Sequence, residues 1–95
     1  MNEHELQKQI LELLNNAGIF CWRSNSGRKH NLVFGKKGSA DITGLLKNGK
    51  RLEIEVKDEK GKQSKDQKEF ERMIKKNKGV YILARSLDDI IGILA

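Results

Sequence analysis

The chain has 95 residues and is strongly basic, with 19 Lys and Arg against 13 Asp and Glu and a formal net charge of +6 at pH 7. This length supports a single domain, residues 1–95, with a modest core. The charge favours a nucleic-acid partner over a membrane, because no lipid-seeking helix or anchor motif is present; a basic surface that only aids solubility is the alternative. The single cysteine, Cys21, excludes an internal disulfide. Without a recognisable signal peptide or spanning segment, we expect a cytoplasmic protein.

The first predicted element is an amphipathic helix over residues 3–17. Its end is marked by Gly18, and its apolar stripe consists of Leu6, Ile10, Leu13, Leu14 and Ala17. Glu3 and Gln7 flank this stripe, so both are candidates to face the rest of the fold. A third candidate, Glu5, shares its face with polar residues, which argues against it. For Glu3 the alternative is a carboxylate that simply favours the positive end of the helix.

A short strand is predicted at residues 19–23, with Phe20 and Trp22 on one side and Cys21, a small core residue, on the other. Residues 24–38 are predicted to form a long loop or a ragged hairpin. The cationic residues, glycines and hydroxyls of this segment suit contacts with a phosphate backbone, which position a duplex without reading its bases. The candidate nucleic-acid-binding residues are Arg23, Ser26, Arg28, Lys29, Lys36, Lys37 and Lys62.

A β-hairpin is predicted around Asn48 and Gly49, a pair typical of a two-residue type I′ turn. Its strands run over residues 41–46 and 51–57. The second strand alternates, with Leu52, Ile54 and Val56 on one face and Glu53, Glu55 and Lys57 on the other. A strict two-residue turn would pair Asp41 with Val56. One bulged residue, which Gly44 could supply, would then bring Asp41 fully beside Glu55.

Asp41, Glu55 and Lys57 are therefore expected to meet at one end of the hairpin. Hard cations such as Mg²⁺ commonly use one or two carboxylates and keep positions for water and substrate phosphate. Such an ion lowers the pKa of a water molecule and stabilises charge on a phosphoryl oxygen, and Lys57 could hold the water or neutralise developing charge. A solvated strand face with a cross-strand ion pair is the alternative that needs no metal.

Residues 58–62 are predicted to form a loop, and Ser64-Lys-Asp-Gln67 is a capping-box pattern that begins a second helix. Phe70 and Ile74 share the inner face of this helix with Gln67. The Gln67 amide then either orients a water or a phosphate, or turns back towards Ser64 to complete the cap. We expect these two roles to compete for one side chain.

Gly79 is predicted to end the second helix, and residues 80–84 form an apolar run that indicates a buried strand. A helix connects this strand back to the sheet, so we expect it to be parallel to its neighbour. Ser86 is expected to cap a final helix that closes the core. The whole pattern predicts the α/β class, with a mixed β-sheet flanked by helices.

The arrangement of Asp41 followed by Glu55-Val-Lys57 on the next strand resembles the Asp…Glu-x-Lys signature of the PD-(D/E)XK nuclease superfamily. Nearly the whole chain resembles, more narrowly, the VRR-NUC (virus-type replication-repair nuclease) family in its small stand-alone phage form. The stretches that carry this resemblance are Trp22-Arg-Ser-Asn-Ser-Gly27, Gly38-Ser-Ala-Asp41-Ile-Thr-Gly44, Ile54-Glu-Val-Lys57 and Gly61-Lys-Gln-Ser-Lys-Asp-Gln67. One departure is Ala40, where many relatives have proline; it removes a backbone constraint but no ligand.

The resemblance implies a restriction-endonuclease-like (PD-(D/E)XK) core and a Mg²⁺- or Mn²⁺-dependent endonuclease that cuts DNA phosphodiesters. Asp41, Glu55 and the Val56 carbonyl would be the metal ligands, and Lys57 would position or activate the nucleophile. Supporting roles in the catalytic site would fall to Gln67, Glu3 and Gln7. Stand-alone relatives resemble Holliday-junction resolvases, which implies a homodimer that cuts four-way junctions in the cytoplasm of a phage-infected host.

Two other functions agree with the same residues. The first is a nuclease of the same fold that acts on flaps or ordinary duplex DNA. The second is a non-catalytic basic module that only binds nucleic acid, in which case the acidic cluster is structural and binding is sensitive to salt.

Overall fold

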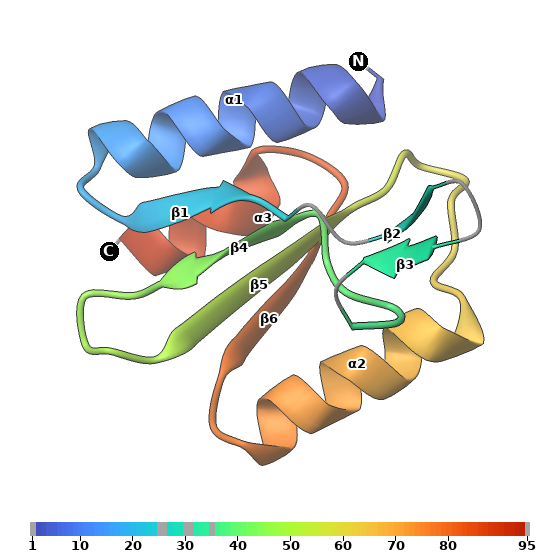
Figure 1. Ribbon diagram of the computed structural model, residues 1–95. Coiled ribbons are helices and arrows are strands. Elements are labelled where there is room, and N and C mark those ends of the chain that lie inside the picture. The colour runs from blue at the N-terminus through green and yellow to red at the C-terminus, as the bar shows by residue number, and fades with distance from the viewer. Residues whose placement is uncertain (1, 25–26, 30–31, 35, 95) are drawn as a thin grey trace.

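The computed structural model describes residues 2–24, 27–29, 32–34 and 36–94. Among these residues, one helix precedes a run of five strands, and a helix, a strand and a short helix follow (Figure 1). In chain order they are α1 (Glu3–Asn16), β1 (Phe20–Arg23), β2 (Gly27–Lys29), β3 (Leu32–Phe34), β4 (Ile42–Leu45), β5 (Arg51–Val56), α2 (Lys65–Lys76), β6 (Val80–Ala84), α3 (Asp88–Ile91) and a 3₁₀ turn (Gly92–Leu94).

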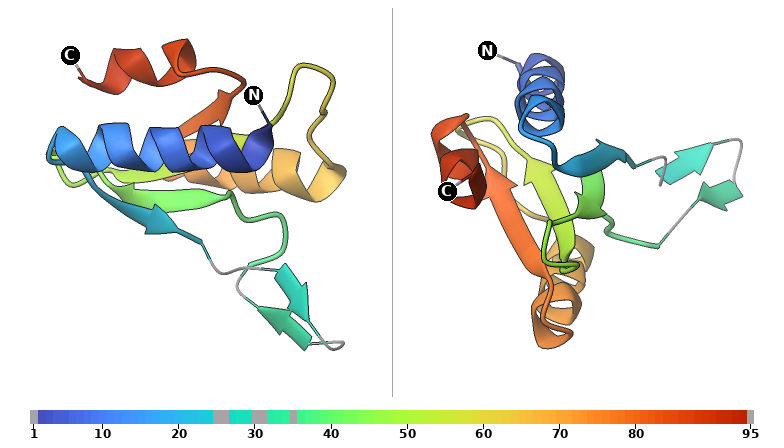
Figure 2. Two further views of the ribbon diagram at one scale, coloured as in Figure 1. Left: turned by 90° about the horizontal axis from the view of Figure 1, so that it is seen from above. Right: turned by 90° about the vertical axis from the view of Figure 1, so that its left-hand side faces the viewer.

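The main sheet has four strands in the order β1-β4-β5-β6. The β1/β4 and β4/β5 pairs are antiparallel, whereas β5 and β6 are parallel and are connected through α2. The predicted α/β class with a mixed sheet is thereby confirmed, as is the parallel pairing of residues 80–84. Of the two forms predicted for residues 24–38, a long loop or a ragged hairpin, the structure has the hairpin: β2 and β3 form a separate antiparallel pair that projects from the body (Figure 2).

The two faces of the sheet are covered by different helices: α1 and α3 lie on one face, and α2 lies on the other (Figure 2). The apolar core forms between the sheet and the α1/α3 layer. Its fully buried large side chains are Ile10, Leu14, Ile42, Leu52, Ile54, Val56 and Ile90. Since each such side chain contributes about 1.5–3 kcal/mol on leaving water, this layer supplies most of the hydrophobic stabilisation.

The hairpin between β4 and β5 differs from the predicted type I′ turn. Gly49 has a positive φ of 88°, but Asn48 has not, so only one residue takes the left-handed conformation. The Gly49 N–H donates to the Leu46 carbonyl, and the Leu46 N–H donates to the Lys50 carbonyl, which describes a type I turn followed by a glycine bulge. This three-residue loop shifts the pairing by one residue relative to the expected register.

Gly44 is not bulged, contrary to the prediction. It pairs regularly with Leu52 on β5 and with Cys21 on β1. A Cβ at this position would collide with the Phe20 carbonyl oxygen and with Cys21, so the glycine is needed for the close approach of β1. The extra residue that brings Asp41 to its place lies in the turn instead.

The helix ends agree only in part with the sequence. At the start of α2 the predicted capping box is present, with Ser64 and Gln67 bonded reciprocally. Its end was predicted at Gly79, but the left-handed residue is Lys78, with φ 69°. The predicted cap of the last helix by Ser86 is wrong, because the carboxylate of Asp89 accepts the backbone N–H groups there. None of the helices in the described part of the chain is long and apolar enough to cross a bilayer.

Candidate functional site

The candidate site begins with two carboxylates on neighbouring strands. Ile42 pairs with Ile54, and continuing this register places Asp41 opposite Glu55. The Val56 backbone N–H donates to Asp41 Oδ2 at 2.8 Å, so the Asp41 side chain extends the β4/β5 ladder by one hydrogen bond. The sequence expectation that Asp41 and Glu55 converge is therefore met by the backbone itself.

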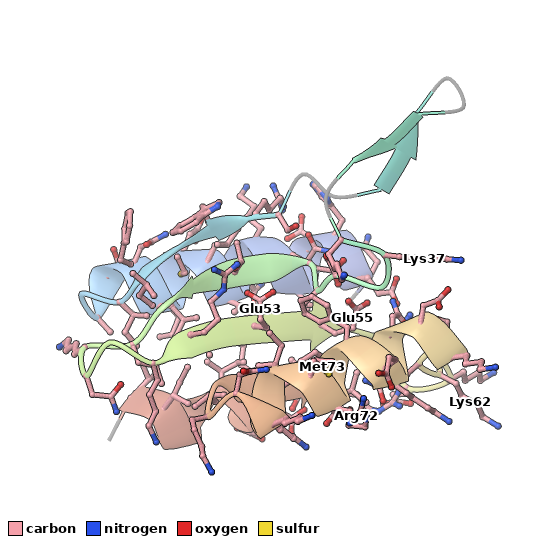
Figure 3. The ribbon with its side chains drawn as sticks, turned by 60° about the horizontal axis from the view of Figure 1, so that its bottom comes forward. Lys37, Glu53, Glu55, Lys62, Arg72 and Met73 are labelled. Atoms are coloured by element: carbon pink, nitrogen blue, oxygen red, sulfur yellow. The ribbon has the colours of Figure 1, made fainter. Side chains whose placement is uncertain are left out.

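Glu55 is buried beneath α2, with 3% of its surface exposed (Figure 3). Its Oε2 atom accepts a hydrogen bond from Gln67 Nε2 at 3.1 Å and lies 3.6 Å from Lys57 Nζ. Its Oε1 atom is also buried but receives no hydrogen bond from any residue that the structure describes. A buried carboxylate oxygen normally has a donor or a cation, and this atom has neither among the described residues.

The electrostatics of Asp41 and Glu55 also favour a bound proton or cation. The pKa of Glu55 is raised to about 8, first by burial and then by the adjacent negative charge of Asp41. The Lys57 ammonium lowers this pKa but does not overcome the other effects. Two carboxyls so close tend to share a proton at neutral pH, and a divalent cation can take the place of that proton.

Gln67 contributes to the helix cap and to the site at once. Its backbone N–H donates to Ser64 Oγ at 3.1 Å, and its Oε1 accepts from the Ser64 N–H at 2.9 Å. Its Nε2 remains directed at Glu55. The expected competition between the two roles is therefore wrong, because the two ends of one amide serve them separately.

The Val56 carbonyl is the third oxygen expected at the site. In a strand, the N–H and C=O of one residue point towards the same neighbouring strand. Since the Val56 N–H meets Asp41, the carbonyl is directed to the same side. Among the described residues there is no group of three or more His, Cys, Asp or Glu that could hold a metal. A cation here would thus use two carboxylates, the carbonyl and outside oxygens, which fits the habit of Mg²⁺ to retain water.

The first-helix candidates, Glu3 and Gln7, lie at the border of the site. Among the described residues, neither forms a hydrogen bond with Asp41 or Glu55. Glu3 Oε1 accepts the backbone N–H of Asp58 at 3.2 Å, directly after Lys57. Gln7 Oε1 accepts from Arg23 Nε at 3.1 Å at the end of β1. Their contacts tie α1 to the ends of the two strands that flank the site.

A groove of about 620 Å³ opens beside this border, between the start of α1 and the loops that follow β5 and β6. Its lining contains both signs of charge, including Glu3, Lys57, Lys60 and Asp88. Arg85 bridges the two loops by donating to the carbonyls of Asp58 at 2.5 Å and Gly61 at 2.8 Å. The groove therefore reaches Lys57 but not the carboxylate pair.

The basic candidates are spread over the molecule rather than gathered in the site. Lys37 and Lys62 extend outwards at the end where α2 begins (Figure 3), and Lys37 Nζ lies 3.5 Å from Asp66. Lys36 is exposed on the same approach to β4. Arg23 is exposed beside Gln7, Arg28 and Lys29 lie on β2, and Ser26 lies outside the described residues.

Several polar residues near the site were missed by the sequence reasoning. Tyr81 on β6 pairs with Glu53, and its pKa is raised to about 12, chiefly by burial, with the charges of Glu55 and Asp41 among the smaller causes. Gln63 Nε2 donates to the Tyr81 hydroxyl at 3.2 Å. The strand alternation in residues 80–84 would have placed Tyr81 on this face, but its aliphatic neighbours obscured the signal.

Glu53 was also missed, because the alternation alone suggested a solvent-facing residue. It is 2% exposed and is held by Arg51 Nε at 3.1 Å and by the Thr43 hydroxyl, which donates to Glu53 Oε2. The face that carries Glu53 and Glu55 is therefore polar but covered, and not a solvated strand face.

No protein-family model matches the chain, and comparisons with curated proteins and with solved structures also give no match.

Proposed function

We propose that this protein is a metal-dependent DNA endonuclease that hydrolyses phosphodiester bonds with a water nucleophile. The observation that carries this proposal is Glu55 Oε1, a buried carboxylate oxygen without a hydrogen bond from the described residues, set beside Asp41. The pair has the oxygen chemistry that a hard divalent cation uses, and such a cation can replace the proton that the two carboxyls share. The basic chain supplies the attraction for a polyanionic substrate.

Each residue of the site has a distinct task in this proposal. Asp41, Glu55 and the Val56 carbonyl hold Mg²⁺ or Mn²⁺, which when bound polarises the scissile phosphate and makes water a better nucleophile. Lys57 orients the attacking water and neutralises negative charge that develops on the phosphate. Gln67 fixes the orientation of Glu55 through its hydrogen bond to Oε2.

The proposal also includes the type of fold, the DNA substrate and the oligomeric state. The order of α1, the hairpin with Asp41 and Glu55, and the α2 crossover is compatible with a restriction-endonuclease-like core, as the sequence resemblance implies. We include in the proposal a four-way DNA junction as substrate and a homodimer as the active species. Two symmetric cuts need two active sites, and one chain carries a single Asp41–Glu55 pair.

The test is a cleavage assay on labelled DNA with Mg²⁺, with Mn²⁺ and with chelator, using four-way junction, flap and linear duplex at equal concentration. We expect metal-dependent cleavage by the wild type. Lys57→Ala should slow this cleavage by about 10²- to 10³-fold, the usual loss when a preorganised group that stabilises the transition state is removed. Lys47→Ala is the matched control, because it removes the same charge at the exposed turn of the hairpin.

The outcomes separate the alternatives. Paired symmetric cuts in the junction, by a species that sediments as a dimer, would support the complete proposal, whereas full activity of a monomer would remove the dimer from it. Preferred cutting of the flap or the duplex would keep the site and replace the substrate. Salt-sensitive binding with no cleavage under any condition would leave a basic binding module and refute the enzyme.

A further inference from the structure

An aromatic surface lies on the same sheet face as Glu55, where α2 does not cover the sheet. It consists of Phe20, Trp22 and Leu45, which are 67%, 45% and 42% exposed. The Phe20 and Trp22 rings lie against each other with centroids 4.9 Å apart and planes at 52°. The helix α2 lies over the β6 side of the sheet (Figure 2), and these side chains of β1 and β4 are exposed to solvent.

The aromatic surface lies close to the carboxylates. Trp22 is paired with Thr43 across β1 and β4, and Asp41 lies two residues before Thr43, directly ahead of the first residue of β4. Diagonal neighbours of this kind are about 7–8 Å apart between their Cα atoms. That distance corresponds to about two stacked nucleotides at 3.4 Å each. A strand whose phosphate reaches Asp41 and Glu55 can therefore place its neighbouring bases over Trp22 and Phe20.

A second copy of the chain is a poorer occupant for this surface. The three side chains expose on the order of 300 Å², given 150–250 Å² for a whole aromatic side chain. Stable interfaces need about 800 Å² from each partner. The net charge of +6 attracts a polyanion. A DNA strand has flat bases, which match the exposed aromatic rings, and a phosphate backbone, which matches the positive charge of the chain.

We propose that Phe20 and Trp22 form a stacking platform for unpaired bases of DNA next to the scissile phosphate. The platform rests on the proposed function for its substrate, and it narrows that substrate to branched DNA with unpaired bases at the cleavage point. Stacking on aromatic rings is tolerant of sequence, because every base has a π-face. The protein would then select DNA by structure without reading its sequence.

The first test uses Trp22 fluorescence, since Trp22 is the only tryptophan in the sequence. Measurements in chelator, which prevents metal-dependent cleavage, keep binding separate from catalysis. An oligothymidylate should quench the fluorescence, whereas an abasic strand of equal length and charge should bind more weakly and leave it unchanged. Equal affinity and equal quenching by both strands would overturn the platform.

The second test measures binding of labelled single-stranded DNA to variants. Trp22→Ala and Phe20→Ala should each weaken binding about 5- to 100-fold, with little change for fully paired duplex. Trp22→Phe keeps an aromatic ring and should retain most of the affinity. Comparison with Trp22→Ala then distinguishes the loss of stacking from the unfolding of the variant. Ile91→Ala is the matched control, because Ile91 is 54% exposed on α3 at the opposite face.

The remaining outcomes also distinguish the two proposals. Normal single-strand binding by Trp22→Ala, together with loss of a dimer in sedimentation, would show that the surface joins two copies and would overturn the platform. Stacking without cleavage of any substrate would uphold the platform and refute the endonuclease. Cleavage that is indifferent to Trp22→Ala and Phe20→Ala would uphold the endonuclease alone.

Discussion

The two faces of the one sheet have opposite character. On the α1/α3 face, Ile42, Leu52 and Ile54 are fully buried among other aliphatic side chains. On the α2 face, Thr43, Glu53 and Glu55 are also buried, but they are polar. None of the residues of α2 above them, all of which are described, is buried.

Because of this difference, one face of each strand stabilises the fold and the other face carries the polar side chains of the candidate site. Successive residues of β5 alternate between the faces, so Ile54 supports the core while Glu53 and Glu55 line the polar layer. Burying a charge is costly unless it is paired. Arg51 offsets the cost for Glu53, and Lys57 and Gln67 offset part of it for Glu55. Glu55 Oε1 has no hydrogen-bond partner among the described residues, and a cation would supply the missing interaction.

The largest expected effect is on the core face. Ile54→Ala should lower the free energy of unfolding by about 2–5 kcal/mol, because Ile54 is fully buried and its truncation leaves a cavity. Urea denaturation followed by circular dichroism measures this loss. Ile91→Ala, at an exposed position, should stay within about 0.5 kcal/mol of wild type. Equal losses in the two variants would contradict the assignment of the core to this face.

The second expected effect is a dependence of stability on pH that comes from the α2 face. In the folded protein without metal, the pKa of Glu55 is about 8 against an ordinary value of 4.5, so the folded state binds the proton more tightly than the unfolded chain. The contribution of Glu55 to stability is then largest below pH 4.5 and decreases as the pH rises towards 8. The slope is at most about 1.4 kcal/mol per pH unit.

Glu55→Gln should flatten this slope, since the amide does not titrate, and thermal melts in chelator between pH 5 and pH 9 measure it. Glu59→Gln is the control, because Glu59 is an exposed carboxylate in the loop just beyond the same strand. Added Mg²⁺ should raise the melting temperature of the wild type most at the alkaline end, where Glu55 is ionised. Identical slopes for wild type and Glu55→Gln would contradict the raised pKa.

The smallest expected effect is the loss of stability when either partner of the α2 cap, Ser64 or Gln67, is substituted. Ser64→Ala and Gln67→Ala each remove part of the capping box, so each should cost about 1 kcal/mol in urea denaturation. Only Gln67→Ala also removes the hydrogen bond to Glu55, and it alone should reduce metal-dependent cleavage, by about 10- to 100-fold. Equal cleavage by the two variants at equal stability would mean that Gln67 acts in the cap alone.

The sequence by itself determined the elements and the face of most side chains. The apolar stripe of α1, the Ser64–Gln67 cap and the alternation in β5 are local patterns, and local backbone geometry converts each into structure. The convergence of Asp41 with Glu55 was also predictable, because a hairpin turn between two strands brings their far ends together.

Only the tertiary structure decided the features that depend on contacts between distant elements. The turn at Gly49 fixed the register, because the strands select the loop that matches their twist. The packing of α2 turned an alternating polar face into a buried one and brought Gln67 towards Glu55, and the parallel pairing of β6 with β5 placed Tyr81 on the same face. The limited reach of α2 left Phe20 and Trp22 uncovered, because burial depends on which element lies above a strand and the strand's own sequence does not specify that element.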